Sequence, residues 1–374
     1  MPGFELIDSK ELKAINSIFK NGGVLFAHGF EKIRKNFHVR EFEKETSTFF
    51  KCKHSLAVSS GTAAIKIALK ALNVKPGDEV ITQAFNFIAT IEAILDVGAK
   101  PVVVNVDRTL NMDIKDLKRK ITKKTKVVLP VHMLGYPCDM KNIMKICKKK
   151  KIKVLEDNCE SIGGKYGKKF LGTIGDLGIL SLDFGKTITT GEGGMILTNN
   201  FKYYDFCKQY HDHGHKNIKN LARGNDKVSI AGFNYRMTEL QGAIGKVQLK
   251  KLNYLLADNK KKFRILEKNI SNFRHREMPI SGETNYDNFI FYEENNLKRK
   301  KILKVLKKHK LGTKNLPDAI KWHCSYYWEH IFKKREIKSV LKTKKILGSA
   351  IAIPIFFKKS TSFYKKLSCE INKI

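Results

Sequence analysis

Between residues 54 and 200, short apolar runs alternate with amphipathic stretches, and this alternation restricts the fold more than any other feature of the chain. Residues 54–60 and 79–82 predict strands. Residues 62–72 predict a helix, because their apolar side chains recur on one helical face. Further strand-like runs follow at residues 101–106, 126–131, 153–156 and 195–198. Nearly continuous apolar strands separated by helices are typical of a mainly parallel sheet covered on both faces. The sequence therefore predicts an α/β fold.

The pattern changes in the last third of the chain. Residues 238–252 predict a helix, and from about residue 255 lysine-rich helical segments alternate with short strands such as residues 288–292. A chain of 374 residues is long enough for one large core and a smaller one. We therefore expect a large domain over residues 1–254, including an N-terminal helical segment, and a smaller C-terminal α+β domain over residues 255–374.

An acid and a lysine near the end of the alternating region suggest a reactive site. Asp157 follows an apolar strand, and ligands gather at the carboxyl ends of strands in open α/β sheets. Lys186 lies 29 residues later, just before the glycine-rich run 191–194. A carboxylate for the pyridine nitrogen and an amine for a Schiff base are what pyridoxal phosphate (PLP) needs. Beside that cationic cofactor in a dry pocket, the pKa of the amine would fall. The alternatives are a helix N-cap at Asp157 and a surface lysine at position 186.

Two further segments could complete such a site. Residues 59–63 join a strand to a helix, where free N–H groups and the helix dipole attract phosphate and Gly61 lets the backbone approach closely. The alternative is an ordinary turn in which Thr62 caps the helix. Phe87 follows the second strand, so its ring could stack on a flat cofactor or pack in the core.

The net charge of +36, from 72 basic and 36 acidic residues, raises the possibility of nucleic-acid binding. The lysines are spread along helix-like stretches, however, so we expect a solvated basic surface and no nucleic-acid partner. No apolar run is long enough to span a membrane, and the start does not look like a signal peptide. The seven scattered cysteines form no CxxC pair, which predicts free thiols in the cytoplasm and no metal site.

Taken together, five motifs resemble the DegT/DnrJ family of PLP-dependent sugar aminotransferases over nearly the whole chain. In chain order they are SGTAA, EDNCES, SLDFGKTITTGEGG, HDHGH and GFNYRMTELQGAIG. The resemblance implies the PLP-transferase fold type I, with a mainly parallel seven-stranded sheet flanked by helices. It also implies that Lys186 bears the Schiff base, that Asp157 binds the pyridine nitrogen, and that Phe87 stacks on the ring. The cofactor phosphate would be held by Gly61, Thr62 and Ser181.

The resemblance further implies a homodimer with active sites at the subunit interface, because Asn234 would reach the phosphate of the neighbouring subunit's cofactor. Glutamate would be the amino donor, and the acceptor would be a keto sugar, either nucleotide-linked or a keto-octulosonate. Residues 1–6, 212–215 and 322–328 are similar to the subgroup that contains 8-amino-3,8-dideoxy-manno-octulosonate transaminase, an enzyme of lipopolysaccharide biosynthesis. Four basic residues would suit a substrate carboxylate or phosphate, although each could equally be an ordinary packed or surface residue: His213, His215, Arg236 and His323.

Glu160 departs from the family pattern. The position three after the aspartate is usually glutamine or histidine in these aminotransferases and contacts the cofactor's phenolic oxygen. An acid there is similar to the family's sugar 3-dehydratases, but those carry histidine in place of Lys186. Glu160 could be protonated in a buried pocket or could lie away from the cofactor. We therefore expect transamination, with a PLP-dependent sugar 3-dehydratase or a non-catalytic member of the family as the alternatives.

Overall fold

The computed structural model contains a seven-stranded sheet in the order β1-β9-β8-β5-β4-β2-β3. The structure describes residues 3–218, 221, 223–226, 228–312, 316 and 320–374, so the first two of the opening residues 1–6 lie outside it. The strands are His54–Val58 (β1), Glu79–Gln83 (β2), Lys100–Val104 (β3), Thr125–Leu129 (β4), Lys153–Asp157 (β5), Leu177–Ser181 (β8) and Gly194–Thr198 (β9). Strand β9 runs antiparallel to both of its neighbours, β1 and β8, and the other six strands all run in one direction. The predicted mainly parallel seven-stranded sheet is confirmed.

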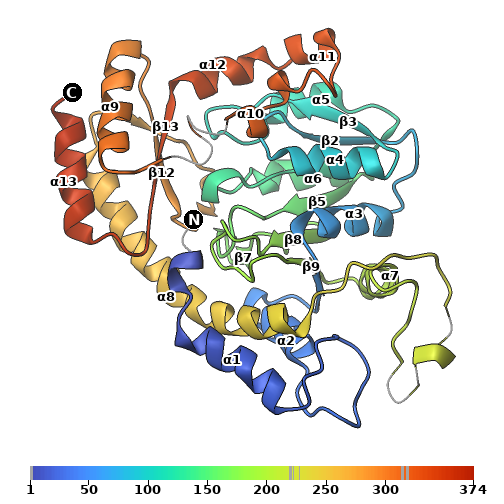
Figure 1. Cartoon of the computed structure of the whole chain (residues 1–374). Coiled ribbons are helices and arrows are strands. Elements are labelled where there is room, and N and C mark those ends of the chain that lie inside the picture. The colour runs from blue at the N-terminus through green and yellow to red at the C-terminus, as the bar shows by residue number, and fades with distance from the viewer. Residues whose placement is uncertain (1–2, 219–220, 222, 227, 313–315, 317–319) are drawn as a thin grey trace.

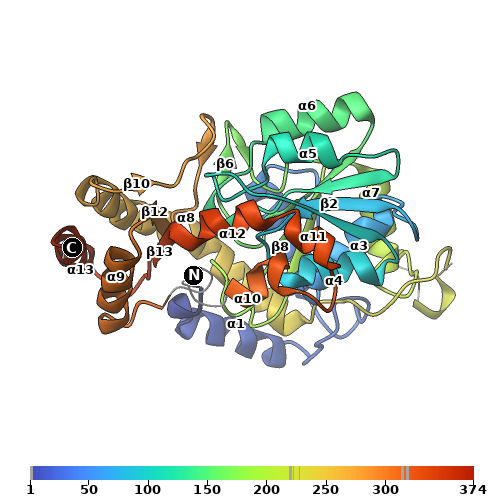
Figure 2. The ribbon, with the colours of Figure 1, turned by 90° about the horizontal axis from the view of Figure 1, so that it is seen from above.

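Helices cover both faces of this sheet (Figures 1 and 2). Val127 of β4 packs in the core with α3 (Gly61–Ala71) and α4 (Ile88–Asp96), whereas its neighbour Val128 packs in the core with α5 (Ile114–Lys120) and α6 (Met140–Lys150). Two more helices cover β1, β8 and β9, namely α2 (His38–Phe50) and α8 (Glu239–Asn269). Successive strand residues point to opposite faces, so burial of both faces explains the continuous apolar strands. None of the described helices has the length and apolar character to cross a membrane.

The C-terminal part forms a second, antiparallel sheet in the order β10-β12-β13. Its strands are Arg274–His275 (β10), Asn288–Tyr292 (β12) and Ala350–Pro354 (β13), and helices α9 (Asn296–Lys308) and α13 (Thr361–Asn372) share its core. Helix α8 continues past residue 252 to Asn269, because residues 246–269 contain neither glycine nor proline and bury Leu255 and Leu266. This helix crosses the expected division at residues 254 and 255, and that division stays a prediction.

A segment from the C-terminal part returns to the large sheet. This segment contains α10 (Ile320–His323), α11 (Lys334–Lys338) and α12 (Leu341–Ser349), and α10 lies near α4 (Figures 1 and 2). Lys120 at the end of α5 donates to the hydroxyl of Ser339, between α11 and α12, at 3.0 Å. The backbone N–H of Asn86 donates to the carbonyl of His323 at 3.0 Å, and the N–H of Ser325 donates to the carbonyl of Ala84 at 2.9 Å. These bonds hold His323 beyond the carboxyl end of β2.

The N-terminal segment also reaches this edge of the sheet. It consists of a short 3-10 helix, η1 (Gly3–Leu6), followed by α1 (Ser9–Lys20). The N–H of Gly3 donates to the carbonyl of Lys186 at 3.0 Å, and a Cβ at Gly3 would lie 2.6 Å from that oxygen. A glycine is therefore required for this close contact with the backbone of Lys186.

Candidate active site

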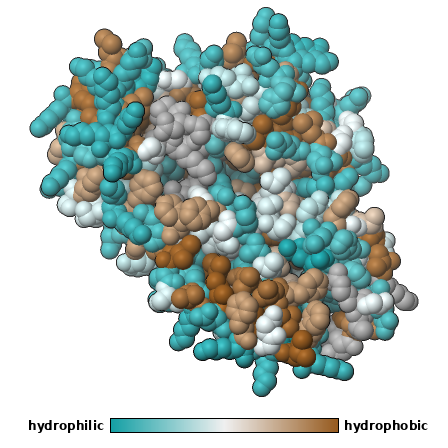
Figure 3. All heavy atoms as spheres, in the orientation of Figure 1, coloured by the Kyte–Doolittle hydropathy of each residue, from teal (hydrophilic) through white to brown (hydrophobic). Residues whose placement is uncertain are grey.

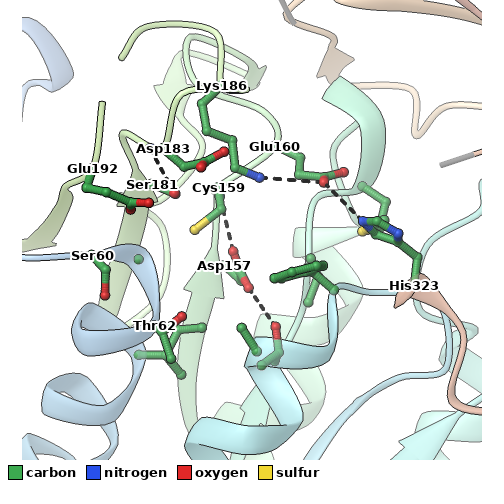
Figure 4. A pocket seen from close by; sticks show the side chains of 17 residues that line it. Ser60, Thr62, Asp157, Cys159, Glu160, Ser181, Asp183, Lys186, Glu192 and His323 are labelled. Carbon is green, nitrogen blue, oxygen red and sulfur yellow. Dashed lines mark hydrogen bonds and ion pairs between the residues drawn. The ribbon is translucent and has the colours of Figure 1, made fainter. Parts of the chain in front are cut away.

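A cavity of about 420 Å³ opens at the carboxyl ends of β5 and β8 (Figure 4). Its wall includes Asp157 from the end of β5, Ser181 from the end of β8, Gly61 from the start of α3 and Lys186 from the loop between β8 and β9. Ligands of open α/β sheets bind at this edge. The fold thus brings residues from three of the sequence motifs to one cavity.

The Lys186 side chain reaches into this cavity, with Nζ 3.6 Å from Oε1 of Glu160 (Figure 4). The side chain is only 9% exposed, so the alternative of a surface lysine is wrong. Burial by itself lowers the pKa of this amine. Neighbouring acidic groups raise the pKa, in decreasing order Glu160, Cys159, Asp157 and Asp183, and the net shift is upward. The lowered pKa expected beside a cationic cofactor stays a prediction, because the positive charge of that cofactor does not enter this balance.

Asp157 is buried at the floor of the cavity and carries two hydrogen bonds. Its Oδ2 accepts the hydroxyl of Thr90 at 3.0 Å, and its Oδ1 accepts the N–H of Cys159 at 3.1 Å. The chain after Asp157 continues in turns until the next strand, β6 (Lys165–Tyr166), so the helix N-cap alternative is wrong. These two bonds fix both carboxyl oxygens in position. Asp157 therefore presents an oriented carboxyl group to a ligand in the cavity.

The first turn of α3 lies on the opposite wall and leaves space for an anion. Ser60, not Thr62, is the N-cap, since its hydroxyl accepts the N–H of Ala63 at 3.1 Å. Thr62 is exposed and lines the cavity. A Cβ at Gly61 would lie 2.9 Å from Cβ of Ser181, so a side chain would fill the space between helix and strand. The N–H groups of a first helical turn have no intrahelical acceptor and favour phosphate.

Phe87 and His323 form the outer wall. The Phe87 ring is 43% exposed, so the alternative of core packing is wrong. Its centroid is 5.3 Å from that of the His323 ring, at an interplanar angle of 44°. His323 is buried at 3% exposed, and its Nε2 is 4.0 Å from Oε1 of Glu160. An exposed ring beside the mouth of a cavity is suited to covering a flat ligand.

Glu160 lines the cavity and does not point away from it. It is 3% exposed, and its Oε2 accepts the backbone N–H of Leu134 at 3.3 Å. Its Oε1 faces Lys186, as described above. The departure from the family pattern therefore falls within the cavity, next to the Lys186 amine.

Four predicted residues do not line this cavity in the described chain: Asn234, His213, His215 and Arg236. Arg236 pairs with Asp212 at 2.6 Å, and His215 lies 3.7 Å from Asp226. Asn234 and His213 are exposed. Their expected contacts stay predictions: for Asn234 with the cofactor phosphate of a neighbouring subunit, and for the other three with a substrate.

The cavity also contains residues that the sequence analysis did not single out. Thr90 holds Asp157, and it follows Phe87, the N-cap of α4, by three positions, a spacing that puts both on one side of a helix. Asp183 and Glu192 line the cavity from inside the lysine motif. Thr90 could have been found from its spacing, whereas nothing in the sequence separates the two acids from ordinary loop residues.

These residues fit PLP. Three features from different walls line one cavity. They are a buried amine, a carboxyl group with two hydrogen bonds, and a helix start with no space for a Cβ at Gly61. They match the aldehyde, the pyridine nitrogen and the phosphate of that cofactor. Lys186, Asp157 and the residues around Gly61 would hold it. Together with the parallel sheet, this arrangement defines the class of PLP-dependent enzymes of fold type I.

Comparisons with known proteins agree with this class. The model of the DegT/DnrJ/EryC1/StrS aminotransferase family matches residues 24–364. GDP-perosamine synthase of Escherichia coli O157:H7 is 37% identical over 238 residues, which cover 63% of this chain and 64% of that protein, less than two thirds of its length. GDP-4-keto-6-deoxy-D-mannose 3-dehydratase of Yersinia pseudotuberculosis is 33% identical over 323 residues, covering 80% of this chain and 79% of that protein.

Solved structures share the fold over nearly the whole chain. An aminotransferase from Psychrobacter cryohalolentis superposes with a TM-score of 0.84 at 24% identity, covering 98% of this chain and 96% of that one. A GDP-4-keto-6-deoxymannose-3-dehydratase with a trapped PLP-glutamate geminal diamine gives 0.80 at 26% identity, covering 98% of both chains. The chain belongs to the DegT/DnrJ/EryC1/StrS aminotransferase family. The predicted family, fold type and cofactor, PLP, are confirmed.

Proposed function

We propose that this chain is a PLP-dependent aminotransferase that moves an amino group from glutamate to a keto sugar. The observation that carries the proposal is the presence of the Lys186 amine and the Asp157 carboxylate in one buried cavity at the carboxyl edge of the sheet. Membership of a family of sugar aminotransferases supports the same activity.

When bound, PLP supplies an electron sink for the carbanion that forms at the α-carbon of an amino substrate. The side chains of the chain do the rest. The Lys186 amine would take the proton from the α-carbon of the amino donor and deliver it to C4′ of the cofactor, and the reverse transfer would serve the keto sugar. Asp157, held by Thr90, would keep a proton on the pyridine nitrogen. Phe87 would cover the ring and limit the access of water, while Gly61, Thr62 and Ser181 would hold the phosphate.

The sugar is proposed from the names of relatives. GDP-perosamine synthases and a GDP-4-keto-6-deoxy-D-mannose 3-dehydratase carry GDP-linked sugars in their names, and a relative from Bacillus subtilis is named a spore coat polysaccharide biosynthesis protein. We therefore favour a nucleotide-linked keto sugar whose amino product enters a surface polysaccharide. The keto-octulosonate of the predicted subgroup, and with it lipopolysaccharide biosynthesis, stays the alternative acceptor. The seven free cysteines suit a reducing compartment, so we propose the cytoplasm.

We extend the proposal to a homodimer. Large hydrophobic side chains are exposed near the N-terminus, including Phe19 and Ile33, each 59% exposed, and Phe30 at 55%. Figure 3 shows hydrophobic side chains gathered on the lower part of one face, over α1, α2 and the chain around them. Monomers rarely expose contiguous apolar patches of this kind. Light scattering coupled to size-exclusion chromatography should give the mass of two 42.8 kDa chains. The mass of a monomer at all protein concentrations would contradict the proposal.

A sugar 3-dehydratase is the second candidate. Glu160 in the cavity and the 33% identical dehydratase relative favour it. Lys186 disfavours it, because the family's dehydratases carry histidine at that position. The two activities differ in their product: transamination adds nitrogen to the sugar, whereas dehydration removes a hydroxyl group without adding nitrogen.

One experiment tests both candidates. The PLP-loaded protein is incubated with glutamate and a panel of keto sugars, including GDP-4-keto-6-deoxymannose and the keto-octulosonate. The products are identified by mass spectrometry. We expect 2-oxoglutarate and an aminated sugar in equal amounts, and a loss of about 10²- to 10⁴-fold in rate for Lys186→Ala. A deoxygenated sugar without new nitrogen would select the dehydratase. A protein that never takes up PLP would refute both.

A further inference from the structure

One oxygen of Glu160 lies between two basic side chains of the candidate active site. Its Oε1 is 3.6 Å from Nζ of Lys186 and 4.0 Å from Nε2 of His323 (Figure 4). The three residues come from the loop after β5, the loop between β8 and β9, and the end of α10. At these separations the carboxylate interacts electrostatically with both basic groups, so the charge of one base affects the pairing of the carboxylate with the other.

The backbone fixes the position of this carboxylate. Oε2 of Glu160 accepts the N–H of Leu134 at 3.3 Å. Leu134 has a φ of 55°, a left-handed conformation that side chains other than glycine adopt rarely. Such a conformation persists only where the surrounding structure enforces it, which is common at functional sites. The carboxylate is therefore held at the cavity wall, and it cannot follow Lys186 freely.

The position of His323 is also fixed. Its carbonyl accepts the N–H of Asn86, and the neighbouring Ser325 bonds to Ala84, so the segment is tied to the chain beyond β2. The imidazole is 3% exposed and lies beside the ring of Phe87. It cannot turn into solvent without breaking this packing. The C-terminal part of the chain thus delivers a basic group to the carboxylate that faces Lys186.

We propose that His323 is a positioning residue that acts on Lys186 through Glu160. The fixed carboxylate interacts mainly with the Lys186 nitrogen while that nitrogen carries a proton, and mainly with His323 when the nitrogen does not. This inference deepens the proposed function, since it concerns the lysine that we assign to the cofactor. The other titratable groups around the amine are Asp157, Cys159, Asp183 and Glu192.

The proposal predicts opposite effects for the two residues. Glu160→Gln removes a negative charge next to the Lys186 nitrogen, so that nitrogen should lose its proton at lower pH. His323→Leu removes the competing partner, so the full charge of Glu160 would act on the Lys186 nitrogen, which should then lose its proton at higher pH. His323→Gln keeps an N–H donor and should stay near the wild type. In the double variant Glu160→Gln/His323→Leu, the effect of position 323 should vanish.

The test is a pH titration of the absorption band of the PLP-loaded protein. We expect the midpoint to fall by about 1–3 pH units in Glu160→Gln, because an opposite charge at this distance shifts titrations by that amount. We expect a smaller shift in His323→Leu, a rise of at least about half a pH unit, because the histidine acts on the Lys186 nitrogen only through Glu160. Glu192→Gln is the matched control: it removes an exposed carboxylate from the same cavity, where solvent screens the charge, and should shift the midpoint little.

A shift from His323→Leu that is as large without Glu160 as with it would overturn the proposal, because the histidine would then act directly. An unchanged midpoint in His323→Leu would also overturn it. If the protein fails to take up PLP, the proposed function fails, but this inference is still decided by acetylation of Lys186 in the cofactor-free protein. The pH dependence of that acetylation, read by mass spectrometry, should shift with the same signs in the same variants.

Discussion

Replacing Asp157 by asparagine removes one negative charge from the cavity floor and leaves the size of the side chain unchanged. In the wild type, Oδ1 accepts the N–H of Cys159 and Oδ2 accepts the hydroxyl of Thr90. An asparagine oxygen can keep the first bond. A hydroxyl can rotate and act as acceptor, so Thr90 can receive the new amide N–H. We therefore expect little loss of folding stability, below about 1 kcal/mol.

The chemistry should respond far more strongly. A hydrogen bond to a charged group contributes about 1.5–3 kcal/mol, and every 1.36 kcal/mol is a factor of ten, so kcat/KM should fall about 10- to 150-fold. The assay is the absorbance change of the PLP-loaded protein on adding glutamate, alongside urea unfolding. Asp176→Asn is the control. Its Oδ2 also accepts a backbone N–H, that of Val154, but Asp176 does not line the cavity. An Asp157→Asn protein with wild-type kcat/KM would refute the role of Asp157.

Three further predictions follow from the geometry. Gly61→Ala should weaken PLP binding at least about tenfold, because its Cβ would lie 2.9 Å from Ser181, whereas Gly348→Ala, with nothing within 4 Å, should leave an absorbance titration with PLP unchanged. Thr90→Val removes the hydroxyl that holds Asp157 and should weaken PLP binding by about 1 kcal/mol, whereas Thr90→Ser keeps the hydroxyl and should bind PLP like the wild type. Equal dissociation constants for the two variants would contradict this. Burial raises the pKa of Asp287 to about 6, so the folded state binds more protons than the unfolded state, and the free energy of unfolding should fall as the pH rises from about 4 to 6. Urea unfolding across this window should show that fall in the wild type and not in Asp287→Asn, and parallel curves would rule it out.

Much of the large sheet could be predicted from the sequence, because the features that form it are local. The apolar run that becomes β5 ends at Asp157. Strand β8, which ends at Ser181, was not among the predicted strands. Parallel strands bring their carboxyl ends to one edge, so the meeting of Asp157 with Ser181 and Lys186 follows only once β8 and the topology are known. The length of α8 was underestimated, because its exposed lysines conceal the buried stripe that continues past residue 252.

Contacts between distant segments could not be predicted in the same way. The pairing of Glu160 with His323 depends on how the C-terminal segment returns to the sheet, and no periodicity in either segment encodes that path. The basic character of His215 and Arg236 does not indicate how far they lie from the cavity. Both side chains face acids outside the cavity. Local patterns specify which face of an element is buried, whereas tertiary connections decide which side chains meet.

The most direct test of the central claim is the chemical identity of the residue that holds the cofactor. The PLP-loaded protein is reduced with borohydride, digested and sequenced by mass spectrometry. We expect a single pyridoxyl group on Lys186, the amine that lies in the cavity with Asp157, and none on the Lys186→Ala protein. A pyridoxyl group on one of the many surface lysines, with Lys186 unmodified, would contradict the account.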